Sequence, residues 1–288
     1  MKNFLLLLIV CFFCACSNNI SKTGENPSDV QRLINKTYEQ MVFVEGGSYM
    51  MGDPRQAFVD ALGKDAWTQY FSSERNVPVH KVTLDSYYMG AYEVTYSDYD
   101  VYTNTIGKEL VLKKYLSRDG HVRDPQNPVG ISWHGAKDYC QWLAGQSGLP
   151  FDLPTEAQWE YAARNRGKIV VFATDDGKAE RGRNFPAEGL GAFPKEVGRF
   201  PPSPMGFYDL SGNASEWIND WYAEDYYSHS PEKNPQGPKT GTRKVVRDGV
   251  GLSDSTTVAR GGSNFLDKNL PGMGFRCVIN TDKPLPTK

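Results

Sequence analysis

The second half of the chain is rich in turn-forming residues, and this feature constrains the fold most. From Gly167 onward, glycine, proline, asparagine and aspartate recur every few residues among aromatic side chains. Glycine and proline interrupt helices and long strands, and asparagine and aspartate favour turns. We therefore expect ordered loops and short strands here, and a modest helix content for the whole chain.

Capping signals predict three helices in the first part of the chain. One of about ten residues begins after Thr95. A second begins after Ser132, where apolar residues recur at helical spacing. A third begins after Thr155, and Gln158 completes its capping box. These helices are expected to be short and to pack by one face.

Two strand patterns precede the helices. Residues 41–52 place two apolar runs around a Glu-Gly-Gly turn at 45–47, which predicts a hairpin. Apolar and polar residues roughly alternate over 79–88, as in a half-buried strand. Together with the helices, these patterns predict an α+β domain that is loop-rich.

Residues 1–15 have the layout of a secretory signal peptide, with an early lysine, an apolar core and small residues at the end. Cys16 follows Ala15 there, which resembles a bacterial lipobox and implies diacylation of Cys16. Plain cleavage without a lipid is the alternative. The absence of aspartate from residues 17–19 resembles outer-membrane lipoproteins. We expect an exported protein anchored to the outer membrane, with its orientation there left open.

The domain organisation follows from composition. Residues 16–38 are polar and predict a flexible tether. No second linker is visible in residues 39–288, which predicts one domain. The net charge is −2 with both signs dispersed, so we expect no nucleic-acid partner.

Four separated blocks of sequence occur in a set order. They are FVEGGSYMMG (43–52), LPTEAQWEYAAR (153–164), GFYDLSGNASEW (206–217), and RGGSNF (260–265) followed by GFRC (274–277). In this order they resemble the sulfatase-modifying factor, or formylglycine-generating enzyme, family. The resemblance covers residues 41–279 and implies the loop-rich fold of that family, which is related to the C-type lectins.

The resemblance implies calcium sites. In the family, the third block holds a calcium ion through a side-chain oxygen and backbone carbonyls, as suits a hard cation. The matching positions here are Asp209, Leu210, Gly212 and Ala214. An Asx-type turn without an ion is the alternative. A second family site falls on Asn184, Phe185, Glu188 and Leu190, but the loop between these residues is much shorter here.

Cys140 and Cys277 are the two cysteines outside the N-terminal region. An even pair in an exported protein favours a disulfide, and two isolated buried thiols are the alternative. The resemblance also implies the disulfide, because cysteines at these positions are bonded in the family.

The resemblance also shows what the chain lacks. Active members oxidise a substrate cysteine with oxygen, using two cysteines that bind Cu(I), because this soft ion needs thiolates. Leu266 stands at the first of these positions and Pro271 near the second. The stretch between Ser263 and Gly274 also lacks a long loop whose arginines help to form the substrate groove. We therefore expect no copper and assign no catalytic residue.

Other reactive groups are not predicted. Distant relatives bind non-haem iron through a histidine triad, but the four histidines here show no close spacing and are interpreted as surface or capping side chains. They are His80, His121, His134 and His229. Glu156 and Glu160 lie on one face of the third helix and are interpreted as solvated charges.

These observations favour a binding or scaffold protein whose formylglycine-generating-enzyme-like domain is non-catalytic. Similar domains occur in lipoproteins of gliding motility and type IX secretion, and in lectin-like display proteins. The expected ligand is a protein or a glycan, besides the membrane that holds the anchor. The alternative is an oxidoreductase of the formylglycine-generating or non-haem iron type, acting on a thiol with a rearranged site. A purely structural envelope protein is a third hypothesis.

Overall fold

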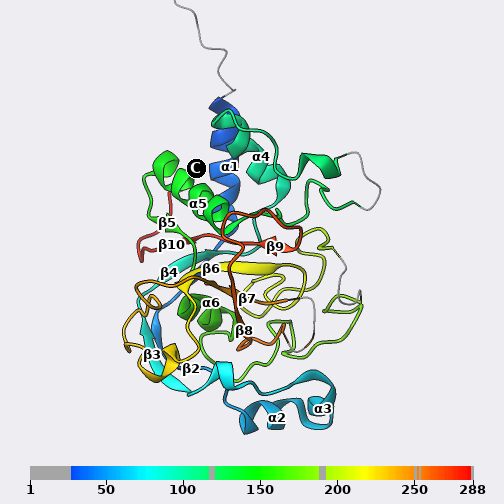
Figure 1. The fold of residues 1–288 in the computed structure, drawn as a ribbon, viewed down its shortest axis with the longest axis vertical. Helices are drawn as coiled ribbons and strands as arrows, with labels where there is room; N and C mark the ends of the chain where they lie inside the picture. Colours follow the sequence, from blue (N-terminus) through cyan, green and yellow to red (C-terminus); the bar gives the residue numbers. More distant parts are fainter. Residues whose placement is uncertain (1–26, 117–120, 188–192, 250–251, 253, 287–288) are drawn as a thin grey trace, which may run out of the picture.

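Figure 1 shows the computed structural model, which describes residues 27–116, 121–187, 193–249, 252 and 254–286. The α-helices are α1 (Pro27–Glu39), α2 (Gln56–Leu62), α3 (Ala66–Gln69), α4 (Tyr96–Thr105), α5 (Trp133–Ser147) and α6 (Glu156–Ala163). The 3₁₀-helices are η1 (Gly63–Asp65), η2 (Glu74–Asn76), η3 (Lys113–Tyr115) and η4 (Tyr226–Ser228). The α+β, loop-rich fold is confirmed. In this part of the chain, no helix is long and apolar enough to cross a bilayer.

Short strands form three sheets in the described part of the chain. The strands are β1 (Met41–Val44), β2 (Gly47–Met51), β3 (His80–Leu84), β4 (Tyr87–Gly90), β5 (Phe151–Asp152), β6 (Ser215–Trp221), β7 (Lys244–Arg247), β8 (Arg260–Ser263), β9 (Met273–Gly274) and β10 (Val278–Ile279). Their orders are β1-β4-β10-β5, β2-β3 and β8-β7-β6-β9. All pairs are antiparallel except β6 with β9, which is parallel. The last strand, β10, therefore lies between strands that come much earlier in the chain.

The three predicted helices are confirmed together with their caps. Thr95 Oγ1 accepts a hydrogen bond from Asp98 N–H at 3.2 Å, and Ser132 Oγ accepts one from Gly135 N–H at 3.1 Å. At the start of α6, Thr155 makes the reciprocal capping box. These bonds satisfy amide groups that the first turn of a helix leaves without partners.

The predicted hairpin over 41–52 is wrong. β1 pairs with β4, and β2 pairs with β3, so the chain passes from one sheet to another at the Glu-Gly-Gly turn. A Cβ atom on Gly46 would lie 2.4 Å from the Leu84 carbonyl oxygen, which explains the need for glycine there. The strand predicted over 79–88 is divided between β3 and β4.

The flexible tether predicted over residues 16–38 differs from the structure in its second half. From Pro27 the chain forms α1, and Leu33 and Ile34 are 5% and 7% exposed. Both side chains join the apolar core that also contains residues of α4 and α5. Burial of this apolar stripe stabilises the helix despite its polar composition. Residues 16–26 lie outside the described part of the chain.

Buried polar contacts join three of the four sequence blocks. The guanidinium of Arg276, from the last block, contacts Glu216, from the third, with Nη2 2.6 Å from Oε1. The other oxygen, Glu216 Oε2, accepts a hydrogen bond from Trp159 Nε1 at 2.9 Å. Arg260 makes a two-pronged pair with Glu156, at 2.7 and 2.9 Å. These three blocks therefore converge inside the domain.

The interpretation of Glu156 and Glu160 as solvated charges is wrong, because they are 2% and 0% exposed. Arg247 lies 3.0 Å from both carboxylates, and Arg164 lies 2.9 Å from Glu160. A buried carboxylate is tolerated only when it is paired and hydrogen-bonded. These glutamates therefore hold the fold together from inside.

Candidate functional site

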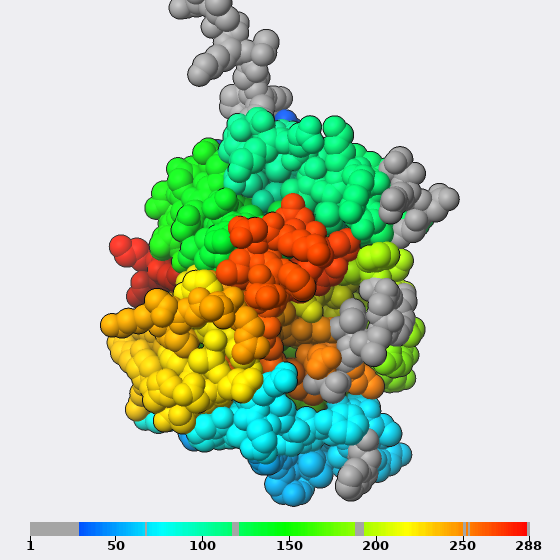
Figure 2. Space-filling model, viewed as in Figure 1, coloured from blue at the N-terminus to red at the C-terminus, as the bar shows by residue number. Residues whose placement is uncertain are grey.

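The segment at which active family members carry their copper cysteines is a short surface loop between β8 and β9. It appears in orange-red near the centre of Figure 2. Asn269 Oδ1 accepts a hydrogen bond from Ser132 N–H at 3.0 Å, and the Leu266 carbonyl accepts one from His134 N–H at 3.2 Å. The loop is thus held against the first turn of α5.

A groove of about 460 Å³ lies beside this loop. Its walls come from α4, the segment that follows α4, the start of α5, and the loop itself. The lining residues are Tyr99, Tyr102, Thr103, Lys108, Glu109, Leu110, Val111, Leu112, Ile131, Ser132, His134, Gly135, Asp138, Asp267 and Asn269. Its size fits a small ligand or a short segment of a larger one.

The one histidine of the groove, His134, forms an exposed pair with Asp267. His134 Nδ1 lies 2.7 Å from Asp267 Oδ1, but the two side chains are 52% and 89% exposed. Exposed pairs of this kind are screened by water, and a reaction centre needs a desolvated environment. Tyr99 and Tyr102 are 3% and 5% exposed, so they form the base of the groove, while the exposed charges of both signs around it can hydrogen-bond to a ligand.

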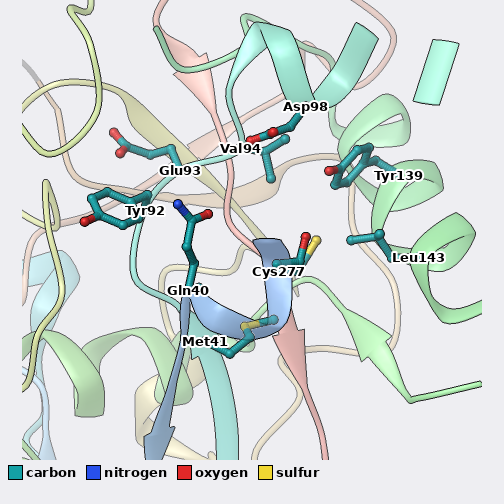
Figure 3. Close-up of a pocket in the computed structure, with 11 residues that line it drawn as sticks. Gln40, Met41, Tyr92, Glu93, Val94, Asp98, Tyr139, Leu143 and Cys277 are labelled. Carbon is teal, nitrogen blue, oxygen red and sulfur yellow. The ribbon is translucent and has the colours of Figure 1, made fainter. Parts of the chain in front are cut away.

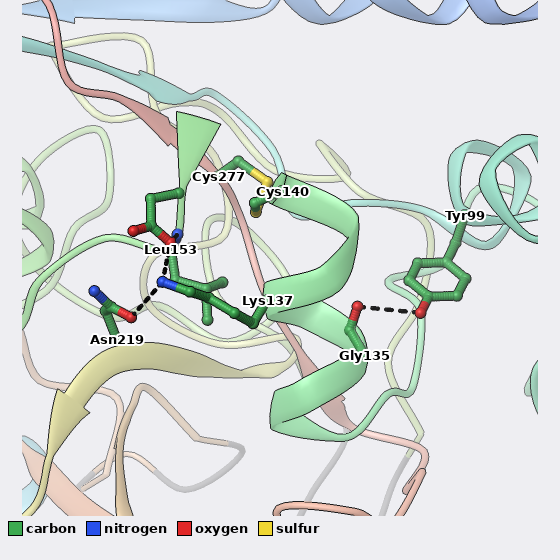
Figure 4. The surroundings of a disulfide bond; sticks show 8 residues. Tyr99, Gly135, Lys137, Cys140, Leu153, Asn219 and Cys277 are labelled. Atoms are coloured by element: carbon green, nitrogen blue, oxygen red, sulfur yellow. Dashed lines mark hydrogen bonds and ion pairs between the residues drawn. A yellow bond between two sulfur atoms is a disulfide. The ribbon is translucent and has the colours of Figure 1, made fainter. Parts of the chain in front are cut away.

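The predicted disulfide is confirmed. Cys140 and Cys277 are bonded, with their Cα atoms 5.8 Å apart, and their residues are 0% and 4% exposed. Figure 4 shows the bond linking α5 to the chain just before β10. On the same helix, Lys137 Nζ contacts Asp152 at 2.5 Å and Asn219 at 3.0 Å. The alternative of two free thiols is excluded.

The first expected calcium position lies in a tight loop. Asp209 and Gly212 both have positive φ, at 56° and 98°. Asp209 Oδ2 accepts a hydrogen bond from Gly198 N–H at 2.6 Å, and Gly212 N–H donates to Asp248 at 2.9 Å. Leu210 and Ala214 are buried on either side. The geometry of an Asx-type turn and that of an ion site are both compatible with this loop.

Glu93 contacts this loop from a distant segment, which the sequence alone did not indicate. It is buried, and its Oε1 accepts a hydrogen bond from Asn213 at 3.1 Å. Among the described residues, Oε2 has no hydrogen-bond partner, and Arg276 Nη2 stays 3.9 Å away. Burial and the charge of Asp209 raise the pKa of Glu93 well above its usual range. Burial also raises the pKa of Asp209, to about 6.

A small cavity of about 40 Å³ lies close by, among α1, β4 and α5. Figure 3 shows Gln40, Glu93, Asp98 and Cys277 around it. This volume has room for water-sized species and excludes an organic ligand.

The second expected calcium position is not supported by its described half. Asn184 Oδ1 already accepts a hydrogen bond from Glu180 N–H at 2.8 Å, and the Phe185 carbonyl accepts one from Gly182 N–H at 2.8 Å. Glu188 and Leu190 lie outside the described residues, as does Cys16. Where the chain is described, no cluster of three or more His, Cys, Asp or Glu side chains is arranged to hold a metal ion.

The histidines lie apart from one another. His80 packs against Tyr227 with 4.7 Å between ring centres, His121 pairs with Asp124, and His229 lies against Tyr226. Only His134 lines the groove. The groove itself had no local signal in the sequence, since its walls come from three distant segments.

Comparison with known proteins places this geometry in a family. A family model described as "Sulfatase-modifying factor enzyme 1-like domain" matches residues 26–281. The formylglycine-generating enzyme of Mus musculus is 26% identical, over 79% of this chain and 74% of that protein. The chaperone protein LppX of Paenibacillus barcinonensis is also 26% identical, over 96% of this chain and 97% of that protein.

The serine/threonine-protein kinase pkn1 of Chlamydia pneumoniae is 29% identical over 84% of this chain, and the chain spans 38% of the length of that relative. Among solved structures, PvdO from Pseudomonas aeruginosa has a TM-score of 0.67 at 25% identity, covering 84% of this chain and 94% of that one. Treponema denticola variable protein 1 has a TM-score of 0.66 at 20% identity, covering 84% and 95%, and shows the fold alone.

Proposed function

Since the chain belongs to the sulfatase-modifying factor enzyme 1-like family, we propose that it is a non-catalytic member: an exported, lipid-anchored module that binds a partner through this fold. The disulfide between Cys140 and Cys277 is the observation that carries the proposal. It occupies the two thiols of the described domain, while Leu266 and Pro271 stand where active members need thiolates. A leucine and a proline offer a soft metal no ligand.

The groove beside the β8–β9 loop supports a binding role. It combines the half-buried Leu110 and Leu112 with lysine, glutamate, histidine and aspartate side chains. This mixture suits a peptide segment, which offers both apolar side chains and hydrogen-bonding groups. The name of the relative LppX, a chaperone protein, supports a protein as the class of ligand. A glycan, as in lectin-like display, is the alternative occupant.

The proposed location is the outer membrane, through a diacyl group on Cys16. The signal-like residues 1–15 and the buried disulfide support export, because disulfides persist in oxidising compartments. We propose to test the gliding-motility and type IX secretion machinery first as the system in which this protein takes part. Replacing Cys16 by serine should release the protein from membranes, and unchanged partitioning into detergent would contradict the anchor.

We also propose that calcium binds at the Asp209 loop. The oxygen-only donor set fits a hard cation, and Glu93 Oε2 is a buried carboxylate oxygen with no hydrogen-bond partner among the described residues. Asp209 would supply a carboxylate, and Leu210, Gly212 and Ala214 would supply carbonyls. Such an ion would stabilise the loop and offset the repulsion between the two buried carboxylates.

Two experiments test the function. Purified protein is incubated with Cu(I), oxygen and a Cys-x-Pro-x-Arg peptide, and aldehyde is sought by mass spectrometry. No copper-dependent aldehyde is expected. Turnover would instead support the oxidoreductase alternative.

The second experiment captures partners from membrane extracts with the wild-type chain and two charge-reversed variants. One variant carries Asp138→Lys and Asp267→Lys, which changes the groove. The matched control carries Asp60→Lys and Asp282→Lys, at exposed acids outside the groove. A protein lost only by the groove variant supports the proposal. A partner held equally by both variants places the binding surface elsewhere, and a partner removed by glycosidase makes the ligand a glycan. Recovery of no defined partner would favour the purely structural hypothesis.

A further inference from the structure

Residues 106–116, which follow α4, form an exposed segment that is both basic and apolar. We call it the lysine segment. Ile106 and Leu116 are 38% and 55% exposed. Three exposed lysines accompany a single acid, Glu109; they are Lys108, Lys113 and Lys114. The combination of exposed apolar side chains with excess positive charge is typical of surfaces that contact phospholipid headgroups.

The segment is held firmly in place from inside. The buried Arg123 donates from Nε to the Val111 carbonyl at 2.6 Å and pairs with Asp100 at 2.5 Å. Val111 is buried, and Leu112 packs against the same core. The lysines on either side of this anchor therefore remain on the surface.

The lysine segment lies at the end of the molecule from which the described chain begins. Lys36, late in α1, contacts Asp98, early in α4, at 2.6 Å. Figure 1 shows α4 running antiparallel to α1, so that the end of α4 lies beside the start of α1. Figure 2 shows the same teal-green region at the upper end of the molecule, opposite the blue and cyan segments that contain α2.

The chain length before α1 limits how far this end can move from a membrane. If Cys16 carries the lipid, residues 17–26 span at most about 36 Å when fully extended. A folded domain of about 250 residues has a radius of gyration of about 18 Å and is therefore roughly 45 Å across. This connection is shorter than the domain, so the domain cannot rest on the bilayer by its opposite end, and the end with α1 and the lysine segment can reach the membrane.

We infer that the lysine segment is a docking surface for anionic phospholipid headgroups, an inference that rests on the proposed anchor at Cys16. The lysines attract the phosphates, and the side chains of Ile106 and Leu116 reach the interface below them. Part of the segment, from Lys108 to Leu112, also lines the groove. The groove consequently opens beside the membrane and meets its ligand there.

Hydrogen exchange on protein-free vesicles tests the inference. The mature chain is attached to vesicles of phosphatidylethanolamine and phosphatidylglycerol in two ways, through its natural acyl group and through Cys16 coupled to a maleimide lipid. Backbone exchange is compared between residues 106–116 and residues 56–65, which contain α2 and η1 at the opposite end of the molecule (Figure 1). We expect several-fold slower exchange on vesicles at 106–116 and no change at 56–65.

The variant with Lys113→Glu and Lys114→Glu should lose this protection, and the control Lys64→Glu should keep it. Equal exchange at 106–116 on and off vesicles in the maleimide-coupled form overturns the inference, as does protection that survives the double charge reversal. Protection that appears only after membrane proteins are added would also overturn it, in favour of a protein partner. A failure of the anchor is recognised separately, because mass spectrometry would then find no acyl group on Cys16 while the maleimide-coupled form still reports on docking.

Discussion

Arg276 and Glu216 face each other inside the domain, with Arg276 Nε 2.9 and 3.0 Å from the two oxygens of Glu216 and neither side chain exposed. The same guanidinium donates to the carbonyls of Gly90, Ala91 and Tyr208. One ion pair thus fixes the β4 end, the Asp209 loop, β6 and the C-terminal strand relative to one another. Arg276 and Glu216 belong to the sequence blocks that indicate the family, and here they hold the surrounding loops in place.

Glu216→Gln should destabilise the domain by about 3–5 kcal/mol, because it leaves the Arg276 charge buried without its carboxylate. Urea unfolding would show a lower midpoint at an unchanged slope. The matched control is Glu232→Gln, since Glu232 pairs with Lys81 on the exposed surface. A midpoint equal to that of the wild type would show that the buried pair contributes nothing to stability.

Replacing both Cys140 and Cys277 by serine should cost about 4–5 kcal/mol of stability on the chain-entropy model, since the bond closes a loop with a sequence separation of 137. The melting temperature of the wild type should fall to that of the double variant when a reductant is added. The melting temperature of the double variant should not change when the reductant is added. A wild-type protein whose melting is indifferent to reduction would contradict this prediction.

Asp220→Asn should change how stability depends on pH. Asp220 is 3% exposed, and burial raises its pKa from 3.8 to about 8. The folded chain therefore keeps a proton that the unfolded chain releases, so the wild type loses stability as the pH rises from about 4 to about 8. Asparagine stays neutral. Its side-chain oxygen can still accept the hydrogen bond that the Glu156 N–H donates to Asp220 in the wild type.

The variant should accordingly be more stable than the wild type at pH 8, by a few kcal/mol, and similar to it near pH 4. Denaturant titrations at a series of pH values measure this, with the exposed Asp282→Asn as control. If the stability of the wild type and of Asp220→Asn depended on pH in the same way, the raised pKa of Asp220 would be refuted.

Calcium should raise the melting temperature of the wild type, and chelation should reverse the rise. An ion at one hundred times its dissociation constant stabilises the folded state by about 2.7 kcal/mol. Asp209→Ala should abolish the shift, and Glu93→Gln should weaken it. Asp60→Ala, on an exposed face of α2, should keep it. A wild-type melt that does not respond to calcium would mean that the loop is an Asx-type turn without an ion.

The helices were predictable because their signals are local. Ser132 and Thr155 bond to amides three residues away, so a short window of sequence contains all the atoms involved. The errors arose where distant segments decide the outcome. Gly46 suggested a hairpin, but its strands pair with β4 and β3, and α1 looked like a tether until its packing against α4 and α5 was known.

Some features of the candidate site were also predictable from the sequence, and others were not. The disulfide was predictable from the compartment, the even number and the resemblance. The groove was not, because Tyr99, His134 and Asp267 come from three segments whose proximity depends on the complete fold. Glu93 and Glu156 were missed because sequence gives no sign that a carboxylate will be buried until its partners, Asn213 for one and Arg260 for the other, are located.

The position of β10 has a consequence for biogenesis. This strand contains Val278 and Ile279, and it pairs with both β4 and β5. A chain without residues 276–279 would have a split sheet, an unbonded Cys140 and no counter-charge for Glu216. We therefore expect the domain to become resistant to proteases only after this strand has joined the sheet.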